Sequence, residues 1–179
     1  MITTRSLPSL IGACAAFALS LCPVIAQDAP PGDPNASWVL VSNAWKAKQA
    51  GKDDEVLTWT DKCIQMYGGK AVEMQKSLTA PPDTTPANKE NVFKNWAVND
   101  VGTAYFIKGQ VLEKQGKTAE AIAAYKYLVD NLGYAQCWDT NGWFWGPAGA
   151  ASERIKALQF DALPTSSAPG TNAAAAPKK

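Results

Sequence analysis

The chain has 179 residues, of which 46% are hydrophobic and 18% charged, with a formal net charge of +1. This length predicts one folded domain with terminal extensions. The near-zero charge argues against nucleic acid or an anionic membrane as the main partner, because both select clustered positive charge. Histidine is absent, which excludes Ser-His-Asp and Cys-His catalysis and most zinc sites. No glycine-rich phosphate loop is present either, so we expect no catalytic residue, metal or cofactor.

The first 26 residues have the features of a secretory signal peptide. Arg5 supplies the positive start, residues 7–21 are apolar and uncharged, and Ala26 stands where a signal peptidase would cut. The apolar stretch is shorter than the ~20 residues that a spanning helix needs. We expect cleavage after Ala26, export to the periplasm or the extracellular space, and no stable membrane insertion of the mature chain. Two alternatives stay open, an uncleaved N-terminal anchor and lipidation of Cys22.

Three kinds of segment follow the signal peptide. Residues 27–36 are rich in proline and predict a linker. Residues 37–160 carry helical periodicity and predict one helical domain. Residues 161–179 consist largely of Ala, Pro, Ser and Thr. They contain too few large apolar side chains to form a core, so we expect a disordered tail.

Within the helical domain, apolar residues recur at spacings of three and four between glycine and proline breaks. Gly51 and Gly116 each end a helix, and Gly102 is a candidate kink. The prolines of residues 79–88 predict the largest internal loop, because proline lacks the backbone N–H that a helix interior needs. The predicted helices cover residues 38–50, 53–67 with a continuation over 71–78, 90–115, 118–132 and 148–160; residues 134–147 are expected to be irregular, with a turn at Asn141-Gly142.

An internal repeat with an offset of 65 residues relates the two halves of the domain. When Gly51 is aligned with Gly116, Ala44 falls on Gly109 and Lys52 falls on Lys117. Each unit consists of a helix, a Gly-Lys turn, an acidic start and a second helix. The two units therefore predict the same local structure.

The second unit resembles a tetratricopeptide repeat over residues 104–132, and residues 38–67 form a degenerate copy. The family pattern places small residues where two helices approach and an aromatic residue four positions after an alanine. The residues that match it, and that the resemblance assigns to repeat packing, are Ala44, Gly51, Gly109, Gly116, Ala121 and Tyr125. The resemblance implies an all-α fold of two antiparallel helical hairpins with a proline-rich internal loop and a C-terminal capping helix. A generic helical bundle is the alternative.

Repeats of this family bind peptides or proteins in a groove lined by the first helix of each hairpin. The resemblance therefore implies a protein or peptide partner, and a role as an assembly or scaffold factor of the cell envelope. The groove positions carried over are Trp38, Val41, Trp45 and Lys48 in the first unit, and Thr103, Phe106, Gln110 and Glu113 in the second. The alternative is that the aromatic residues among them fill the core.

An aromatic cluster follows the second hairpin and has two interpretations. It consists of Trp138, Trp143, Phe144 and Trp145. Its rings either cap the open end of that hairpin or stack on sugars, which makes a glycan-binding protein the alternative function. A glucanase-type hydrolase is disfavoured. Such an enzyme needs two carboxyl groups across a sugar cleft, and only Asp139 and Glu153 are near in sequence, in a chain too short for an extended cleft.

Two cysteines remain after the signal peptide, Cys63 and Cys137. Export to an oxidising compartment permits a disulfide between them, and a bridge closing so long a loop would contribute ~4 kcal/mol to stability. The alternative is two buried free thiols that act as small hydrophobic side chains.

Overall fold

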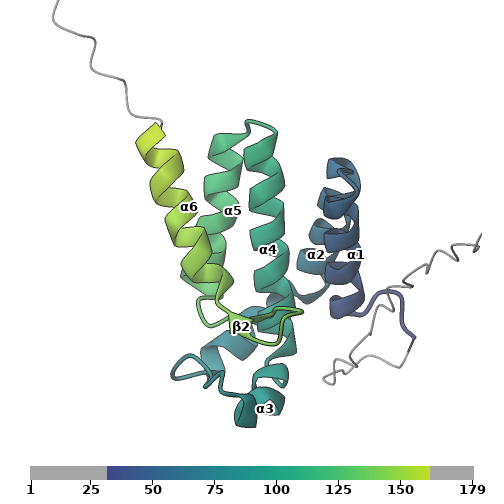
Figure 1. Cartoon of the computed structure of the whole chain (residues 1–179), viewed down its shortest axis with the longest axis vertical. Helices are drawn as coiled ribbons and strands as arrows, with labels where there is room; N and C mark the ends of the chain where they lie inside the picture. Colours follow the sequence, from purple (N-terminus) through teal and green to yellow (C-terminus); the bar gives the residue numbers. More distant parts are fainter. Residues whose placement is uncertain (1–31, 162–179) are drawn as a thin grey trace, which may run out of the picture.

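The computed structural model describes residues 32–161 (Figure 1). The predicted signal peptide, its cleavage site, the first half of the linker and all but the first residue of the predicted tail lie outside this range. Within it the chain forms six α-helices, one short 3-10 helix and a single pair of two-residue strands. The predicted all-α class is therefore confirmed. None of the helices in the described range is both long and apolar enough to cross a membrane.

The longer helices form two antiparallel pairs and one further helix, with the first helix of the second pair at the centre. The central helix is α4, which contacts α1 and α2 on one side and α5 and α6 on the other (Figure 1). The elements in chain order are α1 Ser37–Gln49, α2 Asp53–Ser77, η1 Pro86–Asn88, α3 Lys89–Phe93, α4 Trp96–Lys114, α5 Thr118–Asn131, β1 Cys137–Trp138, β2 Phe144–Trp145 and α6 Pro147–Asp161.

The two helix pairs turn in the same way. Gly51 has φ 71° and Gly116 has φ 73°, the left-handed conformation that glycine adopts without steric cost. Each turn carries the two backbone hydrogen bonds of a Schellman motif, which satisfy carbonyls left free at a helix end. The bonds are Lys52 N–H to Ala47 O and Gly51 N–H to Lys48 O (both 3.0 Å), and Lys117 N–H to Leu112 O and Gly116 N–H to Glu113 O (both 2.9 Å). The sequence repeat is thus also a repeat of local structure.

Helix α2 runs without interruption through Gly68 and Gly69, so the predicted pause between residues 67 and 71 is absent. Two helical glycines cost roughly 1 kcal/mol each relative to alanine. Packing offsets this cost, because Ala71 beyond them is fully buried and α2 lies along α4.

The helix predicted over residues 90–115 is divided into α3 and α4 at Lys94 and Asn95. Asn99 explains where the chain turns. Its side-chain amide donates to Val92 O (2.8 Å) at the end of α3, and its Oδ1 accepts the backbone N–H of Gln136 (2.9 Å). A buried asparagine therefore connects α3, α4 and the segment that follows α5.

Helix α4 continues through Gly102 without a break in the helix. A Cβ atom at this position would lie 2.5 Å from Cβ of Ala135, which is far inside van der Waals contact. Glycine is needed here because the chain after α5 crosses α4 at close range.

The segment expected to be irregular contains a small antiparallel hairpin. Strands β1 and β2 pair Cys137 with Trp145 and Trp138 with Phe144. Its turn is held by Asp139, whose Oδ1 accepts the backbone N–H of Asn141 at 2.8 Å. The predicted Asn-Gly turn is present, and Gly142 has φ 100°, but two-residue strands are too short for a period-two pattern to reveal.

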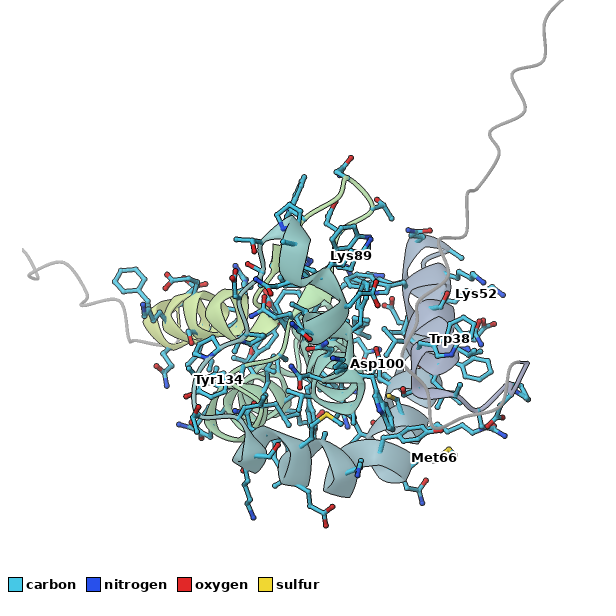
Figure 2. All side chains as sticks on the ribbon, turned by 90° about the horizontal axis from the view of Figure 1, so that it is seen from below. Trp38, Lys52, Met66, Lys89, Asp100 and Tyr134 are labelled. Atoms are coloured by element: carbon cyan, nitrogen blue, oxygen red, sulfur yellow. The ribbon has the colours of Figure 1, made fainter. Side chains whose placement is uncertain are left out.

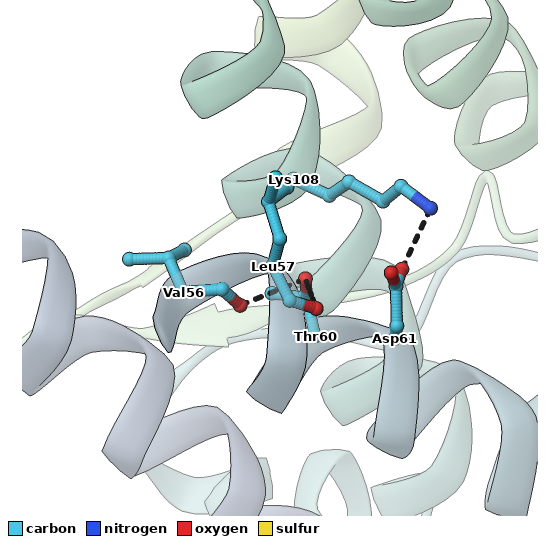
Figure 3. Close-up of polar contacts among 5 residues, drawn as sticks. All are labelled: Val56, Leu57, Thr60, Asp61 and Lys108. Carbon is cyan, nitrogen blue, oxygen red and sulfur yellow. Dashed lines mark hydrogen bonds and ion pairs between the residues drawn. The ribbon is translucent and has the colours of Figure 1, made fainter. Parts of the chain in front are cut away.

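The contact between α2 and α4 combines a buried hydroxyl with an ion pair at its edge (Figure 3). Thr60 is fully buried, and its Oγ1 donates within its own helix, 3.0 Å from Val56 O and 3.1 Å from Leu57 O. Lys108 Nζ lies 2.6 Å from Asp61 Oδ1, so α4 is also tied to the solvent-facing side of α2. The Thr60 hydroxyl is therefore paired within its own helix, and the charged pair lies at the edge of the interface and not inside it.

Gly109 offers a direct test of the close packing between α4 and α5. A Cβ atom there would lie 2.3 Å from Cε1 of the fully buried Tyr125 ring. We predict that Gly109→Ala lowers the free energy of unfolding by about 1–3 kcal/mol through overpacking, measured by urea titration. The matched control is Gly68→Ala, where nothing lies within 4 Å and we expect a gain of about 0.5–1 kcal/mol. Equal effects of the two substitutions would contradict the packing role.

Candidate functional site

The α1 half of the predicted groove retains partly exposed aromatic surface. Trp38 and Trp45 are partly buried, whereas Val41 is 8% exposed and belongs to the core. The ammonium of Lys48 lies 5.1 Å from the centroid of the Trp45 ring, within cation–π range. The Trp38 indole nitrogen is enclosed and has no hydrogen-bond partner in the described range. This half therefore presents two aromatic rings and a positive charge.

The α4 half of the groove is largely covered. Thr103 and Phe106 are buried, at 3% and 7% exposure. The ring of Trp145, from β2, packs edge-on against Phe106 with centroids 5.2 Å apart. The hairpin thus occupies the position over α4 that an open groove would leave free. Gln110 stays partly exposed, although its Oε1 is enclosed without a partner in residues 32–161.

Glu113, the last predicted groove residue, is part of a link between three helices. Arg154 of α6 donates to both carboxylate oxygens of Glu113, from Nε at 3.1 Å and from Nη2. The Tyr125 hydroxyl of α5 donates to Oε2 at 3.1 Å. Burial, followed by the nearby Glu113 carboxylate, raises the pKa of Tyr125, so this phenol stays protonated as a donor. The charge of Glu113 is therefore balanced by Arg154 before any partner binds.

The reachable part of the predicted groove is smaller than the sequence suggested. It consists of Trp38, Trp45 and Lys48 on α1 with Gln110 and Glu113 on α4. Lys48 forms no ion pair within the described residues. Aromatic rings beside an unpaired ammonium suit a partner that brings an apolar side chain and a carboxylate.

Two rings of the aromatic cluster, those of Trp138 and Phe144, pack against α3. Phe93 of α3 contacts the rings of Trp138 (6.1 Å between centroids) and Phe144 (5.4 Å), which in turn lie 4.8 Å apart. Lys89 Nζ sits 3.9 Å from the Trp138 centroid and covers one face of that ring. Trp143 is different, because it lies in the hairpin turn with 53% of its surface exposed.

The structure also brings together a polar cluster that sequence reasoning missed. The Ser37 hydroxyl, at the start of α1, donates to Asp100 Oδ2 of α4 at 2.5 Å. The Cys63 thiol of α2 lies 4.0 Å from Ser37 O, and Figure 2 shows Asp100 near the middle of the molecule beside α1. Burial raises the pKa of Asp100 to about 7, and the hydrogen bond from Ser37 only partly opposes this effect. The sequence did contain a signal for this cluster, because Asp100 is an acidic residue among the apolar residues of α4.

Cys63 and Cys137 are free thiols in the structure, so the expected disulfide is not formed. Cys63 lies in the middle of α2 and is fully buried, while Cys137 lies in β1. Burial raises the pKa of Cys63 well above its usual value and that of Cys137 to about 11. Both thiols therefore stay protonated near neutral pH and act as small packing groups, since the thiolate is the reactive form.

The acidic residues near the aromatic cluster are engaged in local contacts. Asp139 holds the hairpin turn through Asn141, and Glu153 pairs with Lys156 at 2.7 Å. Within residues 32–161, no three His, Cys, Asp or Glu side chains are grouped so that they could hold a metal ion.

Comparison of the chain with protein-family models, with curated proteins and with solved structures finds no match. The functional argument therefore rests on the residues and their geometry.

Asp100 makes the stability of the protein depend on pH. Its pKa in the folded state is about 7, against 3.8 for an ordinary aspartate. The folded protein thus binds the proton more tightly, and stability falls as pH rises from about 4 to about 7. We predict that Asp100→Asn removes this fall and is more stable than the parent protein at pH 8 by about 1–3 kcal/mol, measured by denaturant titration at several pH values.

The control for this experiment is Asp130→Asn, at an exposed position of α5. It should leave the pH dependence unchanged. An Asp100→Asn protein that keeps the full loss of stability between pH 4 and pH 7 would refute the role of Asp100.

Proposed function

We propose that this chain is an exported, non-catalytic binding module that holds a protein or peptide, with two helical hairpins packed in the manner of tetratricopeptide repeats. Export rests on the N-terminal sequence. The binding surface is the aromatic and basic face of α1 together with the exposed parts of Gln110 and Glu113 on α4. A role as an assembly or scaffold factor of the cell envelope fits an exported module of this kind.

The observation that carries the proposal is the duplicated hairpin and its packing order. The first pair, α1 and α2, packs on α4, which opens the second pair, and α6 follows as a cap on α5. In stacked helical repeats, each unit contacts only its neighbours in this way and leaves an extended binding face. Gly109 against Tyr125 supplies the close approach that the repeat pattern requires.

The partner's chemistry follows from the partly exposed residues on this face. Trp38 and Trp45 offer large rings, which anchor interfaces because they bury much apolar area. Lys48 offers a positive charge beside Trp45. The enclosed indole nitrogen of Trp38 and Oε1 of Gln110 are a donor and an acceptor without partners in the described range. The two rings and the ammonium of Lys48 favour an acidic peptide that carries an apolar side chain.

Selection from a random peptide library tests the proposal. We predict enrichment of peptides with an acidic and an apolar residue, and at least a tenfold weaker affinity for Trp45→Ala and for Lys48→Glu, measured by calorimetry or fluorescence anisotropy. A tenfold loss corresponds to about 1.4 kcal/mol, which is modest for an aromatic anchor. Lys126→Glu, at an exposed position of α5, is the charge-matched control and should bind normally. Peptides whose affinity survives both α1 substitutions would place binding elsewhere.

Glycan binding is the alternative function, and one exposed residue favours it. Trp143 presents an open ring on a turn held by Asp139. The other rings of the cluster are packed against Phe93 or Phe106, so this function would depend on Trp143. A polysaccharide-binding assay with the parent protein and Trp143→Ala separates the two functions, since peptide binding should not change in that variant.

Export has its own test. We predict that the protein recovered from the periplasm or the medium begins at Gln27, as measured by intact-mass spectrometry, because cleavage is expected after Ala26. Recovery of a chain that retains Met1 would support an uncleaved anchor, and a lipid-modified Cys22 at the N-terminus would support the lipoprotein alternative.

A further inference from the structure

The outer edge of the first helix pair contains a cavity of about 360 Å³. Its apolar lining comes from Ala47 and Ala50 at the end of α1 and from the partly buried ring of Trp59 on α2. Its polar lining comes from Asn43, Lys46, Lys52 and Glu55, of which Lys52 and Glu55 form an ion pair at 2.9 Å. This volume lies within the range of cavities that hold a small ligand or a large side chain. Since Lys52 is already paired with Glu55, Lys46 is the rim charge without an ion pair in residues 32–161, and it suits an aromatic side chain that is followed by a carboxylate.

The opposite edge of the molecule presents such a pair. Phe160, near the end of α6, is 74% exposed, the largest exposed fraction among the large hydrophobic residues of the described range. The exposed Asp161 follows it. Neither Asp161 nor Lys46 forms an ion pair within residues 32–161. The two edges therefore carry opposite charges that are unpaired in this range, Lys46 beside the cavity and Asp161 beside the exposed ring.

The positions of the two edges permit contact between copies. Figure 1 shows the C-terminal end of α6 and the turn between α1 and α2 at the same end of the molecule but on opposite sides. Figure 2, seen from below, places Lys52 on the side away from α6. A sideways shift of one copy would bring its α6 next to the cavity of a second copy. The cavity and Phe160 of one molecule lie too far apart across the fold to meet each other.

We propose that this chain associates head to tail with a second copy, with Phe160 of one copy entering the cavity beside Trp59 of the next and Asp161 pairing with Lys46. The contact is heterologous, since different surfaces meet. Such a contact leaves one free edge at each end of a dimer, so association continues into longer assemblies. Several peptide-binding faces would then line up in one assembly, which suits a scaffold.

Sedimentation equilibrium tests the association at protein concentrations up to about 1 mM, the range of a weak contact built on one anchor residue. The average mass of the parent protein should rise with concentration beyond that of a dimer. Phe160→Ser and Ala50→Glu should each lower the association constant at least tenfold. The first removes the anchor, and the second places a carboxylate at the cavity against Asp161. Both positions are exposed, so helix content by circular dichroism should be unchanged.

A mixture of the two variants distinguishes this geometry from other modes of association. Phe160→Ser keeps the cavity, and Ala50→Glu keeps the anchor, so an equimolar mixture should form a dimer that does not grow. Trp143→Ser, which removes an exposed aromatic residue elsewhere, should associate like the parent protein. The proposal is overturned if the parent protein stays monomeric at 1 mM, if Phe160→Ser leaves association unchanged, if Trp143→Ser abolishes it, or if the mixture stays monomeric.

Discussion

The close packing of α4 is the constraint on which the rest of the structure depends. Twelve of its nineteen residues are buried, so neighbours must cover it on nearly every side. Two glycines make this possible. Gly109 admits the Tyr125 ring, and Gly102 admits the chain at Ala135, each at a distance that a Cβ atom would block. Because α4 is enclosed in this way, the two helix pairs, the β-hairpin and α6 have little freedom in their positions around it.

That enclosure decides where a partner can bind. Trp145 packs on Phe106 and covers the middle of the α4 face, and Arg154 engages Glu113 near its end. The α1 face keeps Trp45 and Lys48 within reach of solvent because, within residues 32–161, no corresponding hairpin lies over it. A protein with two similar hairpins therefore has an asymmetric surface. The binding face that we propose is weighted towards the first, more degenerate unit, although the second unit carries the clearer repeat pattern.

Buried and partly buried polar side chains connect the segments that regular hydrogen bonding does not. Asn99 joins α3 to the chain at Gln136, and Gln75 Oε1 accepts the N–H of Tyr134 from the same region. Ser37 joins the start of α1 to Asp100. Burying such groups is costly unless they are paired, which is why each has a specific partner. At Asp100 the pairing is incomplete, since a single hydroxyl does not replace the hydration of a carboxylate. The remaining cost of burying the charged form raises the pKa of Asp100.

The sequence by itself determined the helical class, most helix boundaries and the two glycine turns, because periodicity and helix ends depend on residues a few positions apart. The exceptions to these predictions depend on contacts between residues that are far apart in sequence. Gly68 and Gly69 stay helical because α4 supports α2, the helix over 90–115 divides where Asn99 bonds to distant segments, and Gly102 serves a crossing chain. The burial of Thr103 and Phe106 and the free thiols of Cys63 and Cys137 were likewise decided by tertiary structure. Local patterns specify which face of a helix is apolar, but only contacts between segments far apart in sequence decide what covers it.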